Sequence, residues 1–164
     1  MRRLNKHKSN SGFTMIEVLV TLIILSIGLL GLAGLQASSM SNNHNAYLKS
    51  QSTLLANDMA DRLRANIVGV RAGNYNNASG MPGIEETCLD AGCAPDVMAA
   101  HDTHEWNTTL AQQLPAGQGT VTSDDAATFV ITVRWDGNRN RATGTDCDPA
   151  DADDLKCTIL NITL

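Results

Sequence analysis

The sequence is poor in aromatic residues, with 2 Trp, 2 Tyr and 2 Phe among its 164 residues. A core must therefore rest mainly on Leu, Ile, Val, Met and Ala, which supply most of a hydrophobic content of 43%. The common catalytic patterns are also missing, because no nucleophile elbow and no phosphate-binding glycine loop can be found. These absences argue against an enzyme, and the length fits one domain with an appendage.

Acidic residues are absent from the first 12 residues, which carry Arg2, Arg3, Lys6 and Lys8. All 17 acidic residues follow, where they outnumber the remaining Lys and Arg residues. An acidic body lacks the basic face that neutralises phosphates, so we expect no nucleic-acid partner. A basic tip in front of an apolar run is instead a membrane-topology signal.

The segment 13–35 is apolar and contains a single charged residue, Glu17. A helix of this length would span about 34 Å, enough to cross a hydrocarbon core of about 30 Å. Basic residues precede the segment and none follows until Lys49. The positive-inside rule therefore predicts a single pass with a cytoplasmic N-terminus and a body on the other side of the membrane.

Two features distinguish this segment from an ordinary membrane anchor. Glu17 lies inside the apolar run, although an acidic side chain at mid-bilayer costs roughly 2.5–3.5 kcal/mol, which suggests a partner. Gly12 stands directly before the run, whereas a secretory signal peptide has its small-residue cleavage site after it. The simpler alternatives are an uncleaved anchor and a signal peptide cut near Ala37.

The motif Gly12-Phe13-Thr14-Met15-Ile16-Glu17 resembles the processing site of type IV prepilins and type II secretion pseudopilins. The resemblance implies that a prepilin peptidase and methylase cuts between Gly12 and Phe13 and methylates the new amino group. Glu17 then matches the acidic residue at the fifth mature position. Because a buried charge is tolerable only when paired, its natural partner is the Phe13 amine of a neighbouring subunit.

The rest of the chain predicts an α+β fold of the pilin type. Apolar residues at three-, four- and seven-residue steps predict that the helix continues through 36–66, where one face packs on a small antiparallel sheet. Within 67–115 we expect a Gly- and Asn-rich loop over 68–86 and a helix over 96–114. Alternating β-branched residues predict strands within 118–164, at 120–122, 128–135 and 156–164.

Two stretches, 47–66 and 93–135, resemble minor pilins of the PilV family, or type IV pilus modification proteins. This resemblance implies a leader at 1–12, a transmembrane and assembly helix at 13–35, and a periplasmic body at 36–164. The chain would reside in the inner membrane and then join a cell-surface pilus, near its tip or in its initiating complex. Its partners would be other minor and major pilins and the inner-membrane assembly platform. A type II secretion pseudopilin is the alternative.

The four cysteines, Cys88, Cys93, Cys147 and Cys157, all lie in the polar body. An even number in a small exported domain suggests two disulfides. Three pairings are possible, and the short spacings favour Cys88–Cys93 and Cys147–Cys157. The alternative is a zinc site that adds His101 and His104 to the first two cysteines, although the spacing is short for such a site.

An acidic stretch places five carboxylates in nine residues: Asp146, Asp148, Asp151, Asp153 and Asp154. Oxygen ligands at this density could bind Ca²⁺ and would make the chain an adhesive module on a pilin helix. The EF-hand glycine and its final Glu are absent, so we interpret the stretch as a solvated loop. We expect no cofactor.

Overall fold

The computed structural model describes residues 12–83, 92–123 and 127–164. Its elements are α1 (Met15–Ala65), α2 (Ile67–Arg71), β1 (Asn77–Ser79), α4 (Pro95–Gln113), β2 (Gln118–Thr122), β3 (Thr128–Trp135) and β4 (Lys156–Thr163). The chain divides into two compact units, Met1–Asn43 and His44–Leu164, and α1 contributes to both. The second unit is the body, and it holds every strand found in the described residues.

The helix α1 begins at Met15, two residues later than the sequence predicted. The hydroxyl of Thr14 accepts a hydrogen bond from the Glu17 amide at 3.4 Å, and the Thr14 carbonyl accepts from the same amide at 3.1 Å. A threonine followed three residues later by Glu is the capping-box pattern, so Thr14 fixes the helix start. The helix then runs for 51 residues without proline.

Within the body, α1 buries one face at three- and four-residue steps from Leu48 onward. The sequence predicted that this face also includes residues 36–47, but these are exposed. The buried residues are Leu48, Ser52, Leu55, Ala56, Met59, Ala60 and Leu63. They share one core with Trp106 and Leu110 of α4 and with Phe129, Ile131 and Val133 of β3. The predicted α+β fold, a long N-terminal helix with a small antiparallel sheet, is confirmed.

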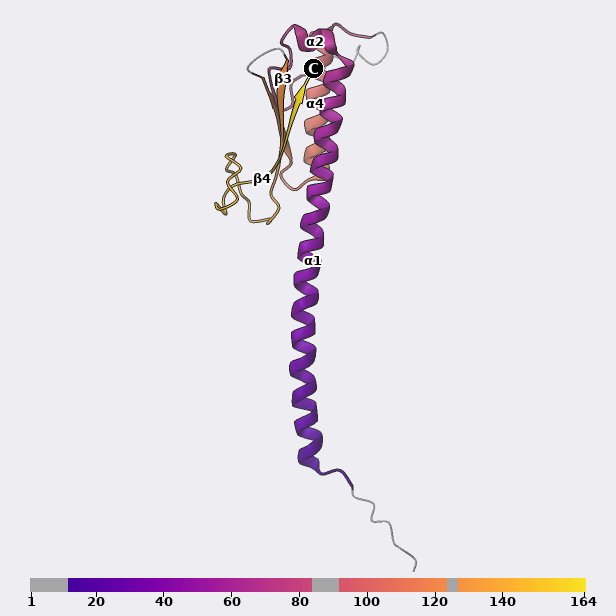
Figure 1. Ribbon diagram of the computed structural model, residues 1–164, viewed down its shortest axis with the longest axis vertical. Helices are drawn as coiled ribbons and strands as arrows, with labels where there is room; N and C mark the ends of the chain where they lie inside the picture. Colours follow the sequence, from indigo (N-terminus) through magenta and orange to yellow (C-terminus); the bar gives the residue numbers. More distant parts are fainter. Residues whose placement is uncertain (1–11, 84–91, 124–126) are drawn as a thin grey trace, which may run out of the picture. The chain divides into compact units, whose positions relative to one another are not determined.

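The sheet has four antiparallel strands in the order β1-β2-β3-β4. Figure 1 shows β3 and β4 side by side, with α4 and the body part of α1 beside the sheet. Phe129, Ile131 and Val133 alternate toward the core, because successive strand residues point to opposite faces. The packing of α4 on β2 is close enough that a Cβ at Gly119 would overlap the Trp106 ring.

The prediction of one long loop over 68–86 was wrong in two places. The short helix α2 begins at Ile67 and overlaps that stretch, and the strand β1 lies within it, while residues 84–86 lie outside the described residues. Asn66 initiates α2 by accepting a hydrogen bond from the Gly69 amide at 3.1 Å, and β1 pairs with only three residues of β2. Neither element is long enough to show a hydrophobic period, which is why the sequence did not reveal them.

Candidate functional site

The residues around the predicted cleavage site precede the first helical turn. Gly12, Phe13 and Thr14 are non-helical and exposed. No atom lies within 4 Å of the position that a Cβ would take on Gly12, and the Phe13 side chain is 84% exposed. The Gly12–Phe13 peptide bond is therefore accessible, as a bond cut by a peptidase must be.

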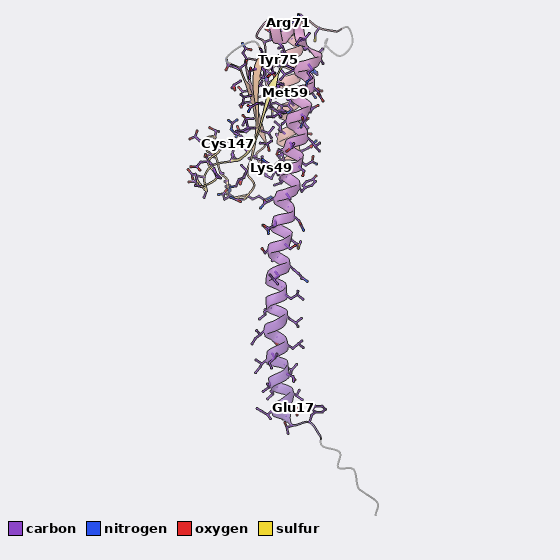
Figure 2. The ribbon with its side chains drawn as sticks, viewed as in Figure 1. Glu17, Lys49, Met59, Arg71, Tyr75 and Cys147 are labelled. Atoms are coloured by element: carbon purple, nitrogen blue, oxygen red, sulfur yellow. A yellow bond between two sulfur atoms is a disulfide. The ribbon has the colours of Figure 1, made fainter. Side chains whose placement is uncertain are left out.

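Glu17 lies in the first turn of α1 and is exposed. Figure 2 shows it at the N-terminal end of the helix. Among the residues that the structure describes, no cation pairs with its carboxylate and no donor bonds to it. The positive end of the helix macrodipole is its one local source of stabilisation, and that effect is typically 0.3–1 kcal/mol. The described residues therefore offer Glu17 no full charge partner.

The apolar segment after Glu17 has no buried residue through Tyr47. Its most apolar 18-residue window reaches a mean hydropathy of 2.6. In the described part of the chain, α1 is the one helix long and apolar enough, by length and composition, to cross a membrane. These side chains need lipid or other apolar helices around them, since exposed apolar area of this extent is unfavourable in water.

The body contains a cluster of polar side chains that sequence analysis did not find. We call it the Asp102 cluster, and it consists of Asp58, Arg62, Tyr75, Asp102 and Glu105. The Arg62 guanidinium donates to Asp58 at 3.1 Å, to Glu105 at 3.0 Å and to Asp102 at 3.3 Å. The fully buried Tyr75 hydroxyl donates to the other oxygen of Asp102 at 2.5 Å. The cluster thus ties α1, α4 and the segment before β1 together.

The charges of this cluster shift two ionisation equilibria. Burial, reinforced by the hydrogen bond to Asp102, raises the pKa of the Tyr75 hydroxyl well above its usual value, so it remains a neutral donor. Burial acts to lower the pKa of Arg62, but Glu105, Asp58 and Asp102 together outweigh it and raise that pKa. Tyr75 and Arg62 therefore each keep the protonation state in which their hydrogen bonds form.

The structure joins Cys147 to Cys157, with their Cα atoms 5.6 Å apart. Cys93 is also disulfide-bonded, while Cys88 lies outside the described residues, so the Cys88–Cys93 pairing stays a prediction. A cysteine in a disulfide offers no thiolate to a metal, and His104 Nδ1 lies 2.7 Å from the Pro82 carbonyl oxygen. The zinc alternative therefore has no support.

Three carboxylates of the acidic loop bond to backbone groups of the loop itself. Asp148, Asp151 and Asp154 each accept a hydrogen bond from a backbone N–H within the loop, at 2.8, 2.9 and 2.8 Å. Over the described ranges, no three His, Cys, Asp or Glu side chains are placed to hold a metal ion. Asp148, Asp151 and Asp154 thus shape the loop that the Cys147–Cys157 disulfide closes, while Asp146 and Asp153 are exposed.

A pocket of about 430 Å³, which the sequence analysis did not predict, lies where β4 begins. Trp135 and Leu155 are nearly buried in its wall, whereas Ile159 is 56% exposed. Lys49 and Lys156 supply its charges. The Lys49 ammonium lies 5.8 Å from the centroid of the Trp135 ring, within the range of a cation–π interaction.

Two family models match the chain, and they cover different parts of it. Residues 7–33 match the prokaryotic N-terminal methylation motif, and residues 34–104 match the type IV pilin Tt1218 family. Neither a curated protein nor a solved structure matches the chain. The two matches meet within α1, and the second ends at His104, inside α4. With its methylation motif, its long apolar helix and its small antiparallel sheet, the chain belongs to the type IV pilin family.

Proposed function

We propose that this chain is a minor pilin that takes part in type IV pilus assembly, near the tip or in the initiating complex. The observation that carries the proposal is Glu17, a charge without an intrachain partner in the described residues, at the start of an exposed apolar helix. Type IV pilins are structural subunits, and this arrangement suits assembly rather than catalysis. A single-pass stage in the inner membrane, with the body in the periplasm, is part of the proposal.

The proposed mechanism has three steps. A prepilin peptidase cuts the accessible Gly12–Phe13 bond, removes the basic leader and methylates the Phe13 amine. The subunit then leaves the bilayer through the assembly platform as its apolar helix exchanges lipid for the helices of other pilins. Glu17 pairs with the Phe13 amine of a neighbour, and this pair sets the axial position of the subunit, since a buried carboxylate without a cation is strongly unfavourable.

The resemblance of 47–66 and 93–135 to PilV-type sequences supports a minor rather than a major subunit. Deletion of the chain should lower the amount of pili sheared from the cells by about tenfold, while secretion of exported enzymes stays normal. Quantitative mass spectrometry of the sheared filaments should find the chain far below the major pilin. Normal piliation with defective secretion would instead identify a type II secretion pseudopilin.

A further inference from the structure

The strand β4 is an edge of the sheet, and its outward backbone groups can be identified. Lys49 of α1 donates to the Cys157 carbonyl at 3.1 Å, so that carbonyl points away from β3. The Leu164 amide donates to the Ala127 carbonyl at 2.9 Å, so Leu164 faces β3. Because strand residues alternate in direction, the backbone groups of Ile159, Asn161 and Thr163 also point outward.

This edge lacks the features that usually protect an edge strand. Such strands are blunted by brevity, proline, bulges or several charges. By contrast, β4 has eight residues, pairs with β3 in an unbroken register, contains no proline and has one charged residue, Lys156. In the described part of the chain, no hydrogen bond reaches the outward groups of Ile159, Asn161 or Thr163. Within the described residues, these outward groups are therefore available to bond to another strand.

The pocket of about 430 Å³ adjoins this edge, because Lys156, Cys157 and Ile159 belong to both. Its charged lining residues are Lys49 and Lys156, and no acidic side chain lines it. Figure 2 shows Lys49 and Cys147 toward one end of the body, with Tyr75 toward the other. An occupant of this pocket needs an apolar part to contact Ile159 and Leu155 and a negative charge to meet the lysines.

We propose that a neighbouring pilin subunit adds an extended, acidic segment along β4 as a fifth strand, with a carboxylate seated between Lys49 and Lys156. This inference rests on the proposed function, because it names the surface through which the assembled subunit binds its neighbour. Strand addition derives affinity from main-chain hydrogen bonds and specificity from side-chain pockets. Here the groups of Ile159, Asn161 and Thr163 supply the bonds, and the lysine pocket selects an acidic partner.

The test compares Asn161→Pro with Asn161→Ala in the full chain. Proline at this position removes one outward N–H and leaves the hydrogen bonds between β4 and β3 in place, since proline is tolerated on the free side of an edge strand. We expect Asn161→Pro to lower the fraction of the chain recovered in sheared filaments by about tenfold, as loss of 1.4 kcal/mol of binding would. Asn161→Ala should behave as the wild type.

Hydrogen exchange keeps the inference testable if Asn161→Pro fails to fold. Amides of Ile159, Asn161 and Thr163 should exchange quickly in the wild-type chain in detergent and slowly in filaments. Lys49→Glu should also lower incorporation. Fast exchange in filaments, or equal incorporation of Asn161→Pro and Asn161→Ala, would overturn the inference. Absence of the wild-type chain from filaments would instead overturn the proposed function.

Discussion

Replacing Glu17 by Val should leave the chain cleaved and inserted in the membrane but lower its incorporation into filaments by tenfold or more. In the proposed pair, removal of the carboxylate would leave the Phe13 amine of the neighbouring subunit as a buried charge without a partner, and breaking such a pair costs about 3–5 kcal/mol. Processing should continue because the Gly12–Phe13 bond is exposed and the Thr14 cap does not need the Glu17 side chain. Membrane fractionation and immunoblots of sheared pili would measure both effects.

The matched control is Glu17→Gln, which keeps the size and hydrogen-bonding capacity of the side chain and removes its charge. If the ion pair carries the effect, Glu17→Gln should be nearly as defective as Glu17→Val. Normal incorporation of Glu17→Gln would mean that hydrogen bonding suffices. Normal piliation and twitching motility with Glu17→Val would refute the charge-pair mechanism for this subunit.

Replacing Asp102 by Ala should lower the free energy of unfolding of the body by about 2–4 kcal/mol. The change leaves the fully buried Tyr75 hydroxyl without its acceptor, which alone costs about 1–3 kcal/mol, and removes one carboxylate from Arg62. Asp102 is 7% exposed, so water cannot replace the lost partner readily. Thermal and denaturant unfolding of the full chain in detergent would measure the loss.

Asp61→Ala is the control for this prediction, because it removes an exposed ion pair that joins Asp61 and Arg64 within α1. Pairs of this kind contribute about 0.2–1 kcal/mol, so its effect should be small. Equal stabilities of the Asp102 and Asp61 variants would contradict the role of the Asp102 cluster.

The wild type should also lose stability as the pH rises above about 10, since Tyr75 ionises in the unfolded chain but not in the folded one. The Tyr75→Phe variant should lose less stability over the same rise in pH.

The features that extend over many residues could be predicted from the sequence. The apolar run and the three- and four-residue steps after it predicted α1, and alternation of β-branched residues predicted β3 and β4. The spacing of Cys147 and Cys157 favoured the disulfide that the structure contains. Each of these patterns is local, because helix and strand periods are set by the geometry of the backbone.

The features that depend on distant residues could not be predicted. Asp102 and Tyr75 meet only when α4 and the segment before β1 are both placed against α1, and neither residue has a local pattern that indicates the other. The same holds for Lys49 and Trp135, which come from α1 and the end of β3. Asp58 and Arg62, four residues apart on one helix, formed the one pair in the Asp102 cluster that spacing could suggest.

The most direct test of the central claim is the intact mass of the chain isolated from cells with and without prepilin peptidase. The account predicts a mature chain that begins at Phe13 and carries one added methyl group on its amino terminus when the peptidase is present. Without the peptidase, the chain should keep residues 1–12 and stay out of sheared filaments. An uncleaved chain in normal cells, or cleavage after the apolar segment near Ala37, would contradict the account.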